Sequence, residues 1–275
     1  RVLFRSQVRK MKIKKEYERW LANAVADTDV AAELKAMDYV EVEDAFYRDL
    51  AFGTGGLRGV IGAGTNRMNI YTVAKASQGL ADYLKKHFKE PSVAIGYDSR
   101  IKSDVFAKVA AGVFTANGVS VNIWPVLMPV PTVSFATRYL HTSAGVMVTA
   151  SHNPGKYNGY KVYGADGCQI TTEAAAEILA EIEKLDIFAD VKTSDFEAGV
   201  ANGSIRYIPD EVYTAFVEQV KSQSVLFGEN VNKNVAIVYS PLNGTGLKPV
   251  TRTLQEMGYT NITVVKEQEQ PDGHF

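Results

Sequence analysis

Ser151 lies in a polar run, Thr149-Ala150-Ser151-His152-Asn153-Pro154, that follows an apolar stretch typical of a buried strand. Pro154 fixes its own backbone φ and biases Asn153 away from the helical conformation. We therefore expect the Ser151 hydroxyl to be exposed at a strand end, where it could act as a nucleophile or a covalent phosphoryl carrier. The Gly-x-Ser-x-Gly motif of a hydrolase is absent. A serine–asparagine turn without chemistry is the more common explanation for such a run taken alone.

A glycine-rich run, Phe52-Gly53-Thr54-Gly55-Gly56-Leu57-Arg58-Gly59, is the second candidate. It fails the Gly-x-Gly-x-x-Gly fingerprint at Arg58, and no Gly-Lys-Ser/Thr follows as in a P-loop. Its backbone could still approach an anion, and Arg58 could bind a phosphate through two donors. A glycine-rich hairpin with a solvated Arg58 explains the run equally well.

Arg100 and Lys161 are the other candidate cations. Arg100 ends the run Asp98-Ser99-Arg100 after a predicted strand, where it could stabilise a transferring phosphoryl group while Asp98 holds Arg100 or Ser99 in place. The alternative is a helix N-cap beside a surface arginine. Lys161 could serve as an acid or a phosphate partner, because burial lowers the pKa of a lysine. Lysines at strand ends are nevertheless usually solvated.

Composition excludes several classes of protein. The 275 residues are 46% hydrophobic and 22% charged, as in soluble globular proteins, and the net charge of −1 offers no basic excess for nucleic acid. No apolar run approaches the ~20 residues of a membrane helix, and the first residues do not form a secretory signal. The single cysteine, Cys168, excludes an internal disulfide. Of the four histidines only His152 adjoins Ser151, and no spacing suggests a transition-metal site. We expect a cytoplasmic protein without nucleic-acid or membrane partners.

The elements that must position these groups alternate between strands and helices. The apolar strands are predicted over 92–97, 119–124 and 144–149, and helices over 103–117 and 132–140. Nearly continuous apolar strands of this kind indicate an α/β sheet that is buried on both faces. Binding groups in such sheets gather at the carboxyl ends of strands, which is where Asp98-Ser99-Arg100 and Ser151 fall.

Flanking segments complete the predicted organisation. Helices are expected in three segments between 14 and 49, a strand over 159–164 and a helix over 172–185, whereas 189–203 is polar and irregular. A helix over 210–220 and a strand–helix–strand unit over 235–265 repeat the α/β pattern. We predict a first domain over 11–208 and an incomplete second domain over 209–275, because one such unit is too small to bury its own core. Residues 1–10 precede a plausible start at Met11, and we interpret them as a non-native extension.

Four ordered motifs together resemble the α-D-phosphohexomutase superfamily, the phosphoglucomutases and phosphomannomutases. The motifs are Gly53–Gly59, Gly96-Tyr97-Asp98-Ser99-Arg100, Thr149–Pro154 and Tyr157-Asn158-Gly159-Tyr160-Lys161. The glycine-rich run and the ending Pro271-Asp272-Gly273 are most similar to the phosphoglucomutase branch that also contains phosphopentomutases. The resemblance implies an α/β fold in which a mixed, mostly parallel sheet lies between helices in domain I, followed by the truncated start of a similar domain II.

The resemblance also implies roles for individual residues. Ser151 matches the family's phosphoserine, whose phosphate is one ligand of Mg²⁺. Arg58 and Lys161 match active-site positions close to it, with Lys161 as the general acid and His152 as a candidate base. Residues implied to contact phosphate or substrate are Arg58, Arg100, Asn153 and Thr54. Phosphoryl transfer needs such cations around the phosphate oxygens and a proton taken from one hydroxyl and given to another.

The implied activity is the interconversion of glucose 1-phosphate and glucose 6-phosphate through glucose 1,6-bisphosphate, with Mg²⁺ as cofactor. Phosphomannomutase and phosphopentomutase are the alternatives within the class, and a non-catalytic phosphosugar-binding module is the alternative outside it. The Asp-Gly-Asp-x-Asp-Arg type of metal loop does not occur in these 275 residues, nor do the family's sugar-reading and phosphate-gripping domains. We therefore expect the chain by itself to be inactive. The sequence indicates no oligomeric state.

Overall fold

The computed structural model describes the backbone of residues 2–274 and the side chains of residues 7–274. Its N-terminal part consists of helices α1 (Val2–Asn23), α2 (Thr28–Ala36) and α3 (Tyr39–Phe46). Trp20 of α1 is fully buried and contacts Phe46, Tyr71 and Phe188 edge-to-face, which attaches these helices to the rest of the chain. The predicted non-native extension continues α1 without a break from residue 2, although Arg1 and the side chains of residues 1–6 lie outside the described part. Its origin stays a prediction.

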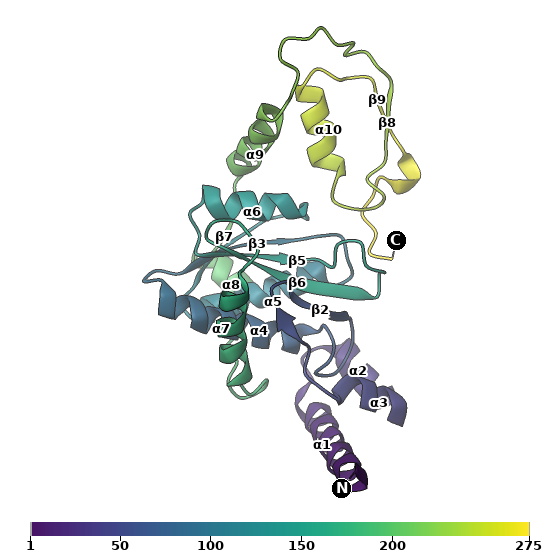
Figure 1. The fold of residues 1–275 in the computed structure, drawn as a ribbon, viewed down its shortest axis with the longest axis vertical. Helices are drawn as coiled ribbons and strands as arrows, with labels where there is room; N and C mark the ends of the chain where they lie inside the picture. Colours follow the sequence, from purple (N-terminus) through teal and green to yellow (C-terminus); the bar gives the residue numbers. More distant parts are fainter. Residues whose placement is uncertain (1, 275) are drawn as a thin grey trace.

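A mixed sheet forms the centre of the molecule (Figure 1). Within residues 2–274 its strand order is β1-β2-β6-β5-β3-β4-β7. The strands are β1 (Phe52–Gly53), β2 (Gly56–Val60), β3 (Ser92–Tyr97), β4 (Ser120–Ile123), β5 (Ala144–Val148), β6 (Tyr157–Gly164) and β7 (Ile205–Tyr207). Strands β5, β3, β4 and β7 are parallel neighbours, whereas β6 is antiparallel to both β5 and β2. Most strands therefore run in one direction, as predicted.

Helices cover both faces of this sheet. Helices α4 (Ile70–His87), α5 (Ser103–Ala116) and α7 (Thr172–Glu183) bury one face, and α6 (Val130–Tyr139) and α9 (Asp210–Ser222) bury the other. Strand β5 is buried along its whole length, and Phe106 and Val133 are fully buried examples from the two opposing helix layers. Each such side chain contributes about 1.5–3 kcal/mol on burial. The predicted α/β sheet between two helix layers is confirmed.

The segment 189–203 differs from the prediction of an irregular stretch. It contains α8 (Phe196–Ala201), whose N-cap is Asp195, because that carboxylate accepts a hydrogen bond from the Ala198 N–H. Strand β7, which the sequence does not predict, follows and pairs with β4. Both elements are too short to show a clear hydrophobic period, and only Ile205 of β7 is buried.

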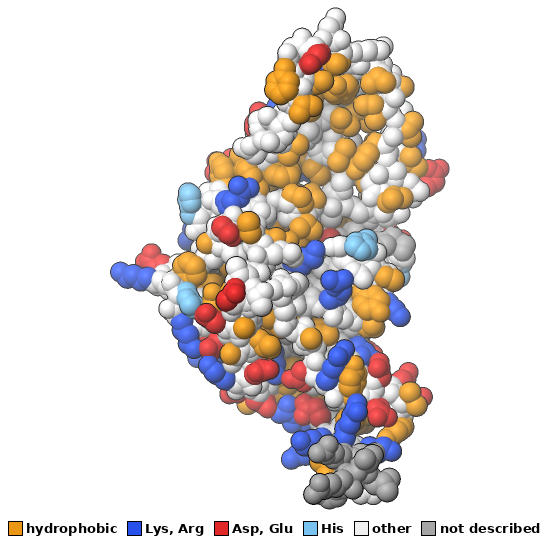
Figure 2. All heavy atoms as spheres, in the orientation of Figure 1, with side chains coloured by type: hydrophobic (Ala, Val, Ile, Leu, Met, Phe, Trp, Pro, Cys, Tyr) orange, Lys and Arg blue, Asp and Glu red, His pale blue; other side chains and the backbone are white. Residues whose placement is uncertain are grey.

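The C-terminal part forms a smaller lobe above the sheet in Figure 1. It contains the parallel pair β8 (Ile237–Tyr239) and β9 (Ile262–Val264), α10 (Leu247–Glu256) and the short helix η1 (Lys266–Gln268). Helix α9 connects the two parts, since it packs on α6 through Val212 and Val217 and also contacts α10. Figure 2 shows hydrophobic side chains gathered on this upper lobe, where Phe227 and Val238 are exposed. No helix in the described range is long and apolar enough to cross a membrane.

Candidate active site

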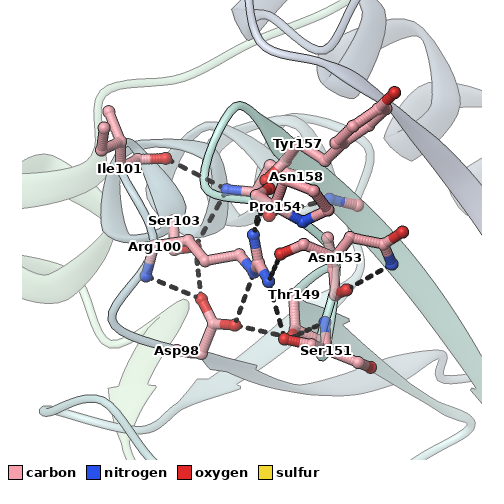
Figure 3. Close-up of polar contacts among 12 residues, drawn as sticks. Asp98, Arg100, Ile101, Ser103, Thr149, Ser151, Asn153, Pro154, Tyr157 and Asn158 are labelled. Carbon is pink, nitrogen blue, oxygen red and sulfur yellow. Dashed lines mark hydrogen bonds and ion pairs between the residues drawn. The ribbon is translucent and has the colours of Figure 1, made fainter. Parts of the chain in front are cut away.

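Ser151 is exposed in a sharp turn directly after β5 (Figure 3). Its backbone adopts a left-handed conformation, with φ of 53°, which is uncommon for a residue other than glycine. Hydrogen bonds hold this turn: the Ser151 N–H donates to Thr149 Oγ1 at 2.9 Å, and both the N–H and the Nδ2 of Asn153 donate to the Ala150 carbonyl at 3.1 and 2.7 Å. The predicted exposed hydroxyl at the strand end is confirmed.

Lys161 faces this hydroxyl from the neighbouring strand. Because β6 runs antiparallel to β5, it brings Lys161 back beside the end of β5, and Lys161 Nζ donates a hydrogen bond to Ser151 Oγ at 2.8 Å. The Lys161 side chain is half-buried. Burial lowers the pKa of its ammonium group and the charge of Arg58 lowers it further, whereas Asp98 raises it. Ser151 therefore contacts a cation that gives up its proton more readily than an ordinary lysine.

Arg58 reaches the site from β2, which pairs with the other edge of β6. Arg58 lies opposite Gly159 in the register, and its side chain is exposed. No hydrogen bond or ion pair joins it to another described residue, so its guanidinium donors are available to a ligand. Thr54 is exposed in the turn between β1 and β2. The glycine-rich run therefore forms a hairpin with an exposed Arg58, whose charge acts on Lys161, and the binding of phosphate by Arg58 stays a prediction.

Arg100 occupies a different place from the one expected. Its side chain is 0% exposed and lies beneath the Ser151 turn. Nη2 donates to the carbonyl oxygens of Ser151 and Asn153, each at 2.6 Å, and Nη1 donates to those of Pro154 and Tyr157 at 3.1 and 3.0 Å. The geometry therefore assigns Arg100 to holding the loop rather than to the phosphate contact predicted from the sequence, because its donors already have backbone partners.

Asp98 links Arg100 to the start of the same turn. It accepts hydrogen bonds from the Arg100 N–H at 3.0 Å, from Ser103 Oγ at 2.8 Å and from Thr149 Oγ1 at 2.6 Å. Its carboxylate also lies 3.5 Å from Arg100 Nε. The sequence suggested that Asp98 holds Arg100, but it did not indicate a role for Thr149. The position of Thr149 within the polar run was the only available signal.

The remaining predicted site residues, His152 and Asn153, make fewer contacts with the groups around Ser151. His152 is exposed and has no hydrogen bond to another described side chain or backbone group. The Asn153 amide group turns back to the loop itself. Among the described side chains, no three His, Cys, Asp or Glu residues gather in an arrangement that could hold a metal ion. The donor set near Ser151 is cationic, so these residues alone do not fit a metal centre.

Comparison with known proteins agrees with this geometry. The family model described as phosphoglucomutase/phosphomannomutase, alpha/beta/alpha domain I, matches residues 49–187, and the model for alpha/beta/alpha domain II of the same family matches residues 213–275. The chain therefore belongs to the phosphoglucomutase/phosphomannomutase family. The two matches leave residues 188–212 unassigned, and the boundary between residues 208 and 209 stays a prediction.

Individual relatives support the same assignment. The chain is 36% identical over 256 residues to the phosphoglucomutase of Staphylococcus saprophyticus, covering 93% of this chain and 46% of that protein. The corresponding values for the phosphoglucomutase of Staphylococcus aureus strain bovine RF122 are 34%, 94% and 46%. The crystal structure of a putative phosphomannomutase from Thermus thermophilus superposes with a TM-score of 0.67 at 25% identity, covering 82% of this chain and 47% of that one. The chain thus spans about half the length of these relatives.

Proposed function

We propose that this chain carries the phosphoryl-transfer residues of a phosphoglucomutase, which interconverts glucose 1-phosphate and glucose 6-phosphate through glucose 1,6-bisphosphate. The observation that carries the proposal is the 2.8 Å contact between Lys161 Nζ and Ser151 Oγ at an exposed turn. An exposed hydroxyl beside a lysine of lowered pKa has the means both to receive and to release a phosphoryl group. The identity to two staphylococcal phosphoglucomutases supports glucose as the sugar.

In the proposed transfer, Ser151 begins as the phosphoserine. A sugar hydroxyl attacks the phosphorus, the bond from phosphorus to Ser151 Oγ breaks, and Lys161 Nζ donates a proton to the departing Oγ. The sugar hydroxyl loses its proton to a base, for which His152 is the candidate. In the return step Ser151 Oγ attacks the phosphorus of the other phosphate of the sugar bisphosphate and gives its proton to Lys161 Nζ, while the bond from that phosphorus to the sugar oxygen breaks and His152 returns its proton to the departing sugar oxygen. Arg58 faces the equatorial phosphate oxygens and neutralises their charge.

The proposed cofactor is Mg²⁺, with the phosphate on Ser151 as one of its ligands. The described side chains contain no acidic cluster that would hold the ion, so the transfer above is derived from Ser151, Lys161 and Arg58 alone. We propose the cytoplasm as the location and a small sugar phosphate as the partner. Phosphomannomutase is the second candidate, supported by the name of the Thermus thermophilus neighbour.

The test is the chemical state of Ser151 in the full-length natural protein. Phosphopeptide mass spectrometry should find phosphate on Ser151, and Ser151→Ala should lower kcat by on the order of 10⁴-fold or more because no carrier remains. Ser222→Ala, on the exposed end of α9, is the matched control and should keep full activity. An active enzyme in which Ser151 is never phosphorylated would contradict the proposal, and activity on mannose phosphates alone would favour the second candidate.

A further inference from the structure

The buried guanidinium of Arg100 is the centre of the Ser151 loop. Figure 3 shows its nitrogens directed toward carbonyl oxygens of the surrounding chain. The four oxygens that it contacts belong to Ser151, Asn153, Pro154 and Tyr157, at 2.6–3.1 Å. The contacts therefore extend from the turn of Ser151 to the first residue of β6. A single side chain from the end of β3 thus holds the whole connection between β5 and β6.

Only an arginine can make this set of contacts. The guanidinium is planar and offers five N–H donors in fixed directions, so Nη1 and Nη2 each reach two oxygens at once. A lysine has three donors at one point and cannot reach oxygens spread over seven residues. The buried charge also needs a counterion, and Asp98, at 3.5 Å from Nε, supplies it.

Asp98 and Arg100 act on opposite sides of Ser151. Asp98 accepts from Thr149 Oγ1, and Thr149 Oγ1 in turn accepts from the Ser151 N–H. Arg100 Nη2 binds the Ser151 carbonyl oxygen. The peptide groups before and after the Ser151 Cα are therefore both tied to the end of β3. This explains how a serine is kept at a φ of 53°, a conformation that it would rarely adopt by itself.

We propose that Arg100, paired with Asp98, is a positioning residue that holds Ser151 so that its Oγ stays directed at Lys161 during phosphoryl transfer. Phosphoryl transfer depends mainly on in-line positioning, and a displacement of about 1 Å can cost on the order of 10²-fold in rate. The contacts that fix the Arg100 guanidinium are with four backbone carbonyl oxygens and the Asp98 carboxylate, not with the Ser151 hydroxyl. The effect of Arg100 is therefore on the rate of transfer and not on sugar binding. The expected effect of Arg100 on the transfer rate rests on the proposed function. The expectation that Arg100 holds the Ser151 loop in place does not rest on it.

The test compares Arg100→Lys and Thr149→Val with Arg67→Lys in the full-length natural protein. Thr149→Val removes one hydroxyl and keeps the shape of the side chain, so it tests the same loop if Arg100→Lys folds poorly. Arg67 is the matched control, because its side chain is only 15% exposed and binds the carboxylate and carbonyl of Asp44 and the carbonyl of Asn66. Its hydrogen bonds are with α3 and the neighbouring Asn66, and none of these partners belongs to the Ser151 loop.

Two measurements separate a positioning role from a general loss of structure. The kcat of Arg100→Lys should fall about 10²-fold and that of Thr149→Val about 10-fold, while KM for the sugar phosphate changes less than about threefold. Hydrogen exchange at the amides of residues 149–159 should become faster in both variants and stay unchanged in Arg67→Lys. Arg67→Lys should also keep its kcat.

The outcomes distinguish this inference from the proposed function. A wild-type protein without mutase activity overturns the proposed function, and the exchange measurement still tests whether Arg100 holds the loop. The inference about Arg100 is overturned if folded Arg100→Lys and Thr149→Val both keep wild-type activity and show unchanged hydrogen exchange at residues 149–159. That result leaves the proposed function intact. A parallel rise in KM and fall in kcat would also contradict it, since that would place Arg100 in substrate binding.

Discussion

The protonation of Lys161 depends on two charged residues from different parts of the sheet, Arg58 on β2 and Asp98 directly after β3. Burial and Arg58 both lower the pKa of the ammonium group, because each disfavours its positive charge, and Asp98 raises it. In the proposed transfer the lysine must carry its proton when it faces the phosphorylated serine. The alkaline limb of activity in that direction therefore falls as the pH rises through the pKa of Lys161.

Replacing Arg58 tests this dependence. Arg58→Gln removes the neighbouring positive charge, so the pKa of Lys161 should rise and the alkaline limb of the kcat profile should move to higher pH. The same change removes the proposed phosphate partner and should lower kcat/KM by about 10- to 100-fold. The measurement is kcat against pH for the full-length natural protein.

Arg206→Gln provides the control for Arg58→Gln. Arg206 is an exposed arginine on β7, at the opposite edge of the sheet from β1 and β2. Arg206→Gln removes the same charge far from Lys161, so it should leave both kcat/KM and the dependence of kcat on pH unchanged. An alkaline limb that stays in place, or moves to lower pH, in Arg58→Gln would show that Arg58 does not act on Lys161 as described.

At the level of elements, the β1–β2 hairpin brings Arg58 to the site only because its backbone lies very close to β6. Gly56 has a φ of 74°, and a Cβ at this position would lie 1.8 Å from the carbonyl oxygen of Tyr160. No side chain fits there, and the backbone of β6 cannot easily move because Tyr160 is fully buried and its hydroxyl is hydrogen bonded to Ser77. The close approach also places Arg58 next to Lys161.

Gly56→Ala should therefore separate β2 from β6. We expect a loss of about 2–4 kcal/mol in the free energy of unfolding, from the left-handed φ and the backbone clash together, and a strong loss of activity in the protein that remains folded. Gly55→Ala, one residue earlier, meets nothing within 4 Å of the added Cβ and should be nearly neutral. The free energies of unfolding of the two variants are compared by urea unfolding. Equal stabilities would contradict the role given to Gly56.

Local sequence signals predicted most of these elements, and distant contacts decided the rest. Helix α2 could be predicted because Asp27 caps it within the same short segment. Strand β7 could not be predicted in this way, because its place depends on pairing with β4, more than 80 residues earlier in the chain. The proximity of Lys161 to Ser151 followed from the resemblance to the family. The burial of Arg100 could not be predicted from the sequence. Its four partners lie more than 50 residues away and are backbone atoms, which carry no residue-type signal.

On the scale of the whole molecule, the last described residues connect the C-terminal lobe with the Ser151 loop. Asn243, in the lobe, accepts a hydrogen bond from the Asp272 N–H and donates one to the Gln270 carbonyl. Gly273 then packs against the turn that contains Arg100: a Cβ on it would lie 2.6 Å from the Ile101 nitrogen and 3.0 Å from the Ser99 carbonyl oxygen. One short segment therefore contacts both the C-terminal lobe and the turn that holds the loop.

Gly273→Ala should loosen this connection. Because the added methyl group meets backbone atoms on the other side, relief requires the whole segment to move, at a cost of about 1–3 kcal/mol. Calorimetry of the 275-residue chain should then show the C-terminal lobe unfolding at a lower temperature than the central sheet, instead of together with it. Gly53→Ala, whose Cβ would meet nothing within 4 Å, should unfold like the unchanged chain. An unaltered transition in Gly273→Ala would mean that α9 and its contacts with α6 are sufficient to hold the two parts together.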